Sequence, residues 1–339
     1  MKKILMMSAA AIVTAGAASA DVNLSGYGRF GLTYNDGVAA GTAQTQIDTR
    51  FRLNIDATMT SDVGVEFGGR VRLQYDDNSA TTVVGTTTPV NTNGVVNSVS
   101  GTTGSGAQLS PADLYAKFAG LRVDVGNVGT AFDNAALMYN SEVGYIGNSD
   151  GDPLGSFYAF ASGPYGADQR NRMGVAVSYA FGAGNVRASI VNPNQQLDGL
   201  PGGQDIEYAI SGDYGFGAFT VSAAYVTNGA GITDNDNYYI GAEYAINDAG
   251  TVGLQYFDDG DETYNVAGDN GEHYTLYGSY VFGQITAKAY VAQRQGGAGD
   301  DTAYGIGADY DLGGALLAVS VREDYNSNTL ADFGVKFNF

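Results

Sequence analysis

The sequence contains no cysteine, no tryptophan and only one histidine. Without cysteine the chain forms no disulfide and no thiolate metal site. Basic residues are also few: 16 Lys and Arg stand against 36 Asp and Glu, which gives a net charge of −20. Such an acidic chain lacks the basic surface that nucleic-acid phosphates require. After residue 20 no apolar run approaches the roughly 18 residues of a membrane-spanning helix, so none is expected.

The first twenty residues have the pattern of a secretory signal peptide. They read MKKILMMSAAAIVTAGAASA, with Lys2 and Lys3 at the start, a short apolar run over 4–17 and an A-x-A cleavage site at 18–20. The alternative is a retained membrane anchor, which the shortness of the apolar run disfavours. Residues 21–339 are then one domain that carries 14 basic and 36 acidic residues, a net charge of −22.

Apolar and polar residues alternate along most of the remaining chain. Fifty Gly, 24 Tyr and 15 Phe favour β-structure with many turns. Alternation with a period of two indicates strands with one apolar and one polar face. Segments of about ten such residues are the weak signature of a transmembrane β-barrel. At the C-terminus the apolar face carries Phe333, Val335, Phe337 and Phe339.

The connections between these segments alternate between tight and long. Turns such as Thr60–Asp62 and Gly182–Gly184 alternate with longer polar stretches such as 35–44 and 128–169. This is the layout of an outer-membrane barrel with short periplasmic turns, long outside loops and periplasmic termini. Sixteen strand-like segments predict an all-β fold, a 16-stranded antiparallel transmembrane β-barrel whose polar faces line a water-filled lumen. The lipid-facing girdles rely on Tyr and Phe, because Trp is absent.

The stretch SGYGRFGLTYND contains Gly26, Gly28 and Gly31 with the G-x-G-x-x-G spacing of a dinucleotide-binding loop. That motif has meaning only between a strand and a helix, and no helix follows here. The three glycines are therefore predicted inside the first strand. Gly26 and Gly28 fall on its outer face, where a missing side chain suits close subunit contact.

The signal peptide, the 319-residue mature length, GYGRFGLTY and the final GVKFNF together resemble the general diffusion porins of Gram-negative bacteria, of the type found in Rhodobacter and related α-proteobacteria. The resemblance covers the whole mature chain. It implies a homotrimer in the outer membrane and a long third loop folded into each lumen. It also implies passive diffusion of small hydrophilic solutes and ions, and a terminal phenylalanine, Phe339, that the barrel-assembly machinery reads.

A row of arginines falls on the predicted lumen face of the first strands. Residues two apart on a strand share a face, so these side chains line one stretch of wall. The wall would form the basic side of a pore constriction, with Lys117 as a further candidate. The alternative is that each cation is simply neutralised by Asp48, Asp56 or Glu66. The predicted basic wall comprises Arg29, Arg50, Arg52, Arg70, Arg72 and Arg122.

The long loop over 128–169 would supply the opposite surface. No Lys or Arg lies between Arg122 and Arg170, so a loop folded inward would carry only negative charge. Charged walls set what passes through a pore, and opposed walls would create a field across it. The predicted acidic side of the constriction comprises Asp133, Glu142, Asp150 and Asp152, with Asp168 beyond them.

No cofactor is expected. Asp150 with Asp152, Asp234 with Asp236, and the acids of 258–261 offer the oxygen ligands that Ca²⁺ prefers. None has EF-hand spacing, so solvated outer-loop acids are the favoured interpretation, with a structural Ca²⁺ at Asp150 and Asp152 as the alternative.

Catalysis is not expected either. His273, the only histidine, has no nucleophile marked beside it and is interpreted as a polar surface residue at the outer start of a strand. Residues 78–112 carry no charge and would form a hairpin above the barrel or a latch onto a neighbouring subunit. Two other functions stay open: a surface-structural or adhesive barrel that acts through its outer loops, and a soluble secreted acidic β-protein.

Overall fold

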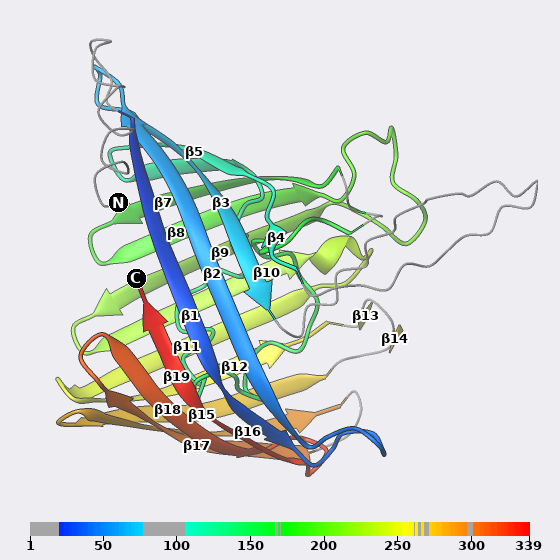
Figure 1. Cartoon of the computed structure of the whole chain (residues 1–339). Coiled ribbons are helices and arrows are strands. Elements are labelled where there is room, and N and C mark those ends of the chain that lie inside the picture. The colour runs from blue at the N-terminus through cyan, green and yellow to red at the C-terminus, as the bar shows by residue number, and fades with distance from the viewer. Residues whose placement is uncertain are drawn as a thin grey trace, which may run out of the picture.

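The computed structural model is a closed antiparallel β-barrel (Figure 1). Its main sheet contains 17 strand segments, of which β4 and β5 are two parts of one barrel strand interrupted at Pro111, so sixteen strands form the wall. The barrel closes where β1 pairs with both β2 and β19. The strand number and the antiparallel order predicted from the sequence are confirmed. The residues that the structure describes are 20–76, 106–166, 169, 171–260, 262–263, 266–267, 271–296 and 301–339.

Two sequence-based predictions fall largely outside the described residues. These are the signal peptide of residues 1–20 and the uncharged stretch 78–112. The first half of the wall is built from β1 (Asp21–Asn35), β2 (Thr45–Thr60), β3 (Glu66–Asp76), β4 (Gln108–Leu109), β5 (Asp113–Phe118), β6 (Leu121–Gly126), β7 (Met173–Phe181), β8 (Gly184–Asn192) and β9 (Glu207–Phe216).

The second half continues with the same up-and-down order. Two short strands, β13 (Glu262–Thr263) and β14 (Val266–Ala267), form a separate hairpin in the connection between β12 and β15. The strands of this half are β10 (Phe219–Thr227), β11 (Asn237–Asn247), β12 (Gly250–Asp258), β15 (Glu272–Phe282), β16 (Ile285–Gln295), β17 (Asp301–Asp311), β18 (Ala315–Glu323) and β19 (Thr329–Asn338).

Tight turns lie at one end of the barrel and the longer connections at the other (Figure 1). Gly182 and Gly283 occupy tight turns with φ of 54° and 65°, a left-handed conformation that favours glycine. The start of β1 lies at the tight-turn end, because Asp21 pairs with Thr58 just before the turn into β3. The predicted sorting of connections by parity is therefore confirmed.

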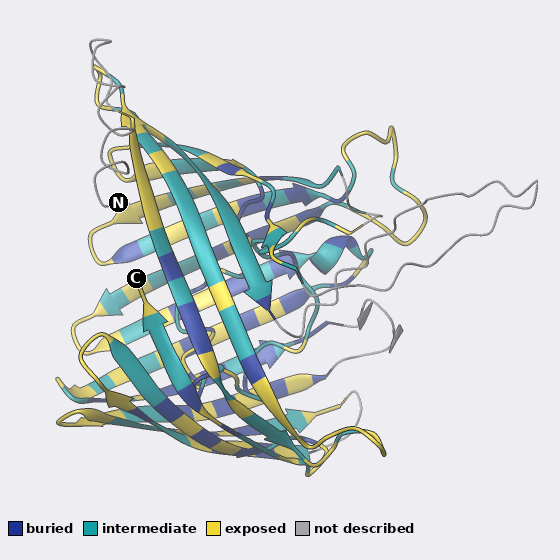
Figure 2. Cartoon of the chain, viewed as in Figure 1, coloured by how far each residue is buried: buried dark blue, intermediate teal, exposed yellow. Residues whose placement is uncertain are grey.

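The outer wall is apolar, as the alternation predicts. On β11, Ile240 is 60% exposed, whereas its neighbour Tyr239 is fully buried on the inner side. Figure 2 shows this exchange of exposed and buried residues along the strands. In a membrane the exposed apolar side chains face lipid, and closure of the sheet leaves no unpaired strand edge in the hydrocarbon.

Gly26 and Gly28 lie on the outer face of β1, where the C-terminal strand covers them. A Cβ atom at Gly26 would stand 2.0 Å from the ring of Phe339, and one at Gly28 would stand 2.5 Å from the ring of Phe337. The Phe339 ring also stacks on Phe51, with ring centroids 5.4 Å apart. The missing side chains thus make room for aromatic rings of the same chain at the seam where the barrel closes.

Candidate pore constriction

The connection between β6 and β7 folds back inside the barrel, and we call its residues 127–166 the inward segment. Its contacts are with inward-facing side chains of the wall. Among them are Arg29 of β1, Arg72 of β3, Ser189 of β8, Tyr239 of β11, His273 of β15 and Lys336 of β19. The tip is held by three hydrogen bonds. Arg29 donates to the carbonyl of Ile146 (2.9 Å), Lys336 donates to the carbonyl of Gly144 (3.0 Å), and the backbone N–H of Tyr145 donates to Asp332 (2.8 Å).

Apolar packing fixes the outgoing half of the inward segment. Phe132 and Met138 are each 1% exposed and pack against Tyr239 and Phe257, which are fully buried on the inner faces of β11 and β12. The Tyr239 hydroxyl donates to the carbonyl of Ala136 (3.0 Å). The sequence predicts an entirely polar lumen face, and this prediction is wrong for these strands. Their inner aromatic rings are covered by the segment rather than by water, so their burial stabilises the fold.

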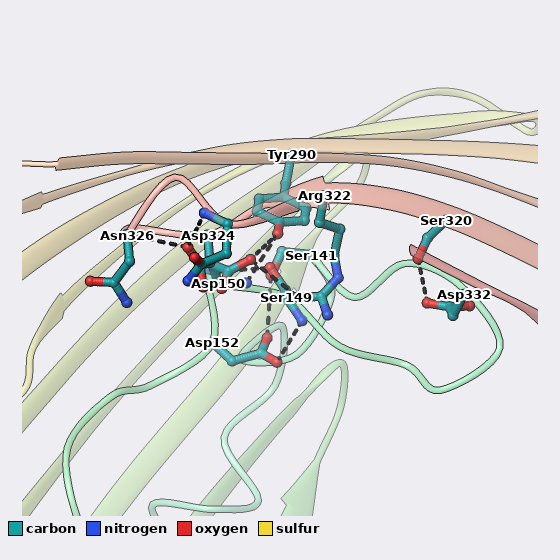
Figure 3. A network of polar contacts seen from close by, with 12 residues as sticks. Ser141, Ser149, Asp150, Asp152, Tyr290, Ser320, Arg322, Asp324, Asn326 and Asp332 are labelled. Atoms are coloured by element: carbon teal, nitrogen blue, oxygen red, sulfur yellow. Dashed lines mark hydrogen bonds and ion pairs between the residues drawn. The ribbon is translucent and has the colours of Figure 1, made fainter. Parts of the chain in front are cut away.

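Charged groups fix the returning half (Figure 3). The Asp150 carboxylate accepts from Arg322 of β18 at 3.1 Å and from the hydroxyl of Tyr290 of β16 at 2.6 Å. Further along, the Asp259 carboxylate accepts from the backbone N–H groups of Leu154 (2.8 Å) and Gly155 (3.0 Å). Since the Arg322 side chain is only 8% exposed, its pairing with Asp150 is a buried contact that is costly to break.

His273 belongs to this attachment, and its prediction as a surface residue is wrong. The imidazole is fully buried, stacks on Phe257 with centroids 4.5 Å apart, and has Nδ1 at 2.6 Å from Asp259. Its Nε2 lies 3.3 Å from the carbonyl of Gly151. The cause is the strand parity: His273 is on the inner face of β15, and the inward segment passes over it.

The predicted acids of the inward segment face different partners. Asp150 pairs with Arg322 rather than with a member of the predicted basic wall. Asp152 accepts from the Ser141 hydroxyl (3.3 Å) and from the backbone N–H of Ser149 (3.2 Å), both within the segment (Figure 3). Asp133 accepts from the hydroxyl of Tyr139 at 3.0 Å. Asp168 lies outside the described residues.

Burial keeps several of these acids from ionising readily. It raises the pKa of Glu142 to about 7, although Lys288 and Lys336 act in the opposite direction. Burial, reinforced by the Glu142 charge, raises the pKa of Asp152 to about 8. It also raises the pKa of Asp133. The negative charge of the segment therefore depends on pH close to neutrality.

Four of the six predicted wall arginines are ion-paired. Glu66 accepts from the Tyr115 hydroxyl (2.9 Å) instead of neutralising an arginine. The other two arginines of the predicted wall, Arg52 and Arg72, have no carboxylate within 4.0 Å among the described residues. Each donates to an amide oxygen instead. The pairs are Arg29 with Asp48 (3.0 Å), Arg50 with Asp76 (2.5 Å), Arg70 with Asp56 (2.6 Å) and Arg122 with Asp124 (2.5 Å).

A hollow of about 650 Å³ separates this wall from the start of the inward segment. Arg70, Arg72 and Arg122 line one side, and Asn134 and Phe160 of the segment line another. The structure thus brings three of the predicted basic residues together around one space. Arg29 is instead buried beneath the tip of the segment, with its side chain 5% exposed.

Sequence reasoning missed several cations of the inner wall. Arg187 of β8 also lines the hollow and pairs with Asp213 at 2.5 Å. Arg322 and Lys336 hold the inward segment. Their strand parity places them on the inner face, but they are scattered along the chain and lack the dense spacing of the arginines in the first strands. No cluster of three or more His, Cys, Asp or Glu suited to a metal ion occurs among the described residues.

Comparisons with known proteins agree with this architecture. Residues 8–329 match a family described as Gram-negative porin. The chain is 40% identical over 322 residues to a porin of Fuscovulum blasticum, with 94% of this chain and 100% of the relative covered. A porin of Rhodobacter capsulatus is 28% identical over 344 residues, with 94% and 100% covered. A solved mutant form of Rh. blastica porin superimposes with a TM-score of 0.81 at 39% identity, covering 94% of this chain and 100% of the other.

Proposed function

The chain belongs to the Gram-negative porin family and is an outer-membrane channel for passive diffusion of small hydrophilic solutes and ions, and from this premise we propose where it selects them. Selection takes place in the hollow between the inward segment and the arginines of β3, β6 and β8. The observation that carries the proposal is a contact across this space. Arg72 of β3 donates to the Ser162 hydroxyl of the segment at 2.8 Å, and its guanidinium lies 4.6 Å from the ring centre of Phe160.

Opposite charges on the two sides of the constriction would create a transverse field. Arg52 and Arg72 contribute positive charge that no described carboxylate within 4.0 Å neutralises. Asp133, next to the lining residue Asn134, contributes negative charge on the segment side when it is ionised, and Glu142 adds charge further along the segment, near Lys288 and Lys336. Such a field orders water and disfavours apolar solutes, whereas small polar solutes and hydrated ions pass. The role needs no catalytic step and no cofactor.

Planar-bilayer recording under a KCl gradient tests this proposal. The protein should conduct, with a reversal potential that mildly favours cations, because the chain carries a net charge of −20. The double substitution Arg52→Gln/Arg72→Gln should shift the reversal potential further towards cations. Unchanged selectivity would show that the arginine wall does not select ions. Absence of any conductance would favour a structural or adhesive role for the outer loops.

Assembly features follow as further proposals. The mature protein is a homotrimer that begins at Asp21 after removal of a signal peptide, and the barrel-assembly machinery reads Phe339. The exposed apolar outer wall supports association within the membrane. Mass spectrometry of the mature chain and conductance steps in multiples of three test the first two statements. Steps of single size with a monomeric band in native electrophoresis would contradict the trimer.

A further inference from the structure

We propose that Asn54 and Gln74 are specificity-determining residues, which hold Arg52 and Arg72 in the constriction without neutralising them and so create a subsite for small anions. This inference rests on the proposed function of the constriction. The guanidinium groups of Arg52 and Arg72 form the subsite, and the amide side chains of Asn54 and Gln74 set its net charge.

The four residues belong to a ladder on the inner faces of β2 and β3. The strand register pairs each of four arginines directly with an oxygen acceptor on the neighbouring strand. The two outer rungs are ion pairs and the two middle rungs are arginine–amide pairs. In order along the ladder the rungs are Arg50 with Asp76, Arg52 with Gln74, Arg72 with Asn54, and Arg70 with Asp56.

The amide rungs reproduce the geometry of the acidic rungs but not their charge. Arg52 Nε donates to Gln74 Oε1 at 2.7 Å, and Arg72 Nε donates to Asn54 Oδ1 at 3.0 Å. Arg70 Nε donates in the same way to Asp56 Oδ1 at 2.6 Å. An amide oxygen accepts the hydrogen bond and fixes the side chain, but the guanidinium keeps its full positive charge. The middle of the ladder therefore carries two positive charges more than its ends.

The surroundings leave this charge in place. The aspartates of the two outer rungs are already paired with Arg50 and Arg70. Neither carboxylate is therefore left to neutralise Arg52 or Arg72. The other partners of Arg72 are the hydroxyl of Ser162 and the ring of Phe160, and the ring of Tyr27 lies 6.0 Å from the Arg52 guanidinium. All are neutral. Arg72 lines the hollow, and the positive charge of Arg52 acts on it from the neighbouring rung. Two adjacent guanidiniums suit chloride or a small oxyanion, because they offer several N–H donors and a positive potential.

Charge can be added at the amides without removing an arginine. Gln74→Glu and Asn54→Asp keep the shape and the acceptor oxygen of each rung and convert it into an ion pair. We expect each to lower the chloride-to-potassium permeability ratio on the order of twofold, and the double variant to match Arg52→Gln/Arg72→Gln. The reverse changes, Asp56→Asn and Asp76→Asn, should raise the ratio by a similar factor.

Control variants distinguish the role of Asn54 and Gln74 from the proposed role of the constriction. Gln44→Glu makes the same change of charge on an exposed connection outside the lumen and should leave the ratio within experimental error. Heat-modifiable electrophoretic mobility confirms that each variant still forms the barrel. If Arg52→Gln/Arg72→Gln shifts the ratio and the amide variants do not, the control by Asn54 and Gln74 is refuted while the constriction stands. If neither shifts it, the proposed constriction itself is wrong.

Discussion

Two regions of the inner wall carry cations with the same strand parity but use them differently. On β18 and β19, Arg322 and Lys336 bind the Asp150 carboxylate and the Gly144 carbonyl of the inward segment. On β2 and β3, Arg52 and Arg72 are held by amides, and Arg72 borders the open hollow. The comparison supports our proposal that the partner, rather than the cation itself, decides whether a lumen cation supports structure or selects solutes.

Substitution of Arg29 tests whether this arginine of β1 supports the structure or selects solutes. Its loss should have the largest effect on stability. Arg29→Gln leaves the carboxylate of Asp48, 4% exposed, without its partner and removes the hydrogen bond to Ile146. We expect a loss of roughly 3–5 kcal/mol in stability, as for other buried charges left unpaired. Denaturant unfolding in detergent measures it, and ion selectivity should change little.

A charge-conserving variant gives the control for Arg29. Arg29→Lys keeps the positive charge but loses the planar fork that reaches both carboxylate oxygens of Asp48. It should recover part of the stability. A selectivity change as large as that of Arg72→Gln, with normal stability, would instead place Arg29 among the selecting residues.

The next largest effect should come from the clamp between Asp150 and Arg322. Asp150→Asn keeps the shape but leaves the Arg322 guanidinium, 8% exposed on its side chain, without a carboxylate. We expect a loss of about 2–3 kcal/mol in the attachment and increased open-channel noise, because the returning half of the inward segment loosens. Single-channel recording and limited proteolysis of the segment measure both.

The pair of Arg294 and Asp301 offers a matched control. It too is an ion pair, but it joins the neighbouring strands β16 and β17, and the Asp301 side chain is 46% exposed. Asp301→Asn should cost at most about 1 kcal/mol and leave the noise unchanged. Equal noise in both variants would mean that the clamp does not hold the segment.

The sequence was sufficient to predict the barrel, because a period of two and the alternation of short and long connections are properties of the chain itself. Ile240 and its outward neighbours follow that rule directly. The rule could not predict that Tyr239 and Phe257 are covered, because their cover comes from residues more than a hundred positions earlier. The same reason explains the error at His273, whose position on the inner face was readable but whose burial under Gly151 was not.

The candidate site was predictable as a set of arginines but not as a set of charges. Parity placed Arg50, Arg52, Arg70 and Arg72 on one face, and the structure agrees. Which of them is neutralised depends on the register of β2 against β3, and a shift by two residues would place Arg52 opposite Asp76 and Arg72 opposite Asp56. Register is set by the turn between the two strands, so composition alone could not separate Arg52 from Arg50.

A smaller effect is expected from pH, through the inward segment. Burial raises the pKa of Glu142 from 4.5 to about 7, so the folded protein favours the neutral acid. The contribution of Glu142 to the free energy of unfolding is therefore highest at low pH. This contribution is lost as the pH rises from the pKa of the unfolded chain to that of the folded protein, and above the latter the loss is complete. Over the same range the segment gains negative charge, and cation preference should rise by less than about twofold between about pH 5.5 and about pH 8.5.

Glu142→Gln should flatten this dependence, leaving the contribution of Asp152, whose pKa is raised to about 8. Reversal potentials recorded as a function of pH provide the measurement. Asp62→Asn, on an exposed tight turn, is the control and should leave the profile unchanged. If the pH profile of Glu142→Gln is identical to that of the unmodified chain, Glu142 does not contribute to ion selectivity.

The smallest effect on stability should come from the outer wall, where Phe339 closes the seam on the opposite face of the wall from both cation groups. Phe339→Ala removes the stacking on Phe51 and the cover over Gly26, which we expect to cost about 1 kcal/mol because the ring is half-exposed. Refolding in detergent measures that cost in the absence of assembly factors. A much larger loss of barrel in cells than in refolding would support recognition of Phe339 by the assembly machinery, whereas equal losses would leave the ring with a packing role alone.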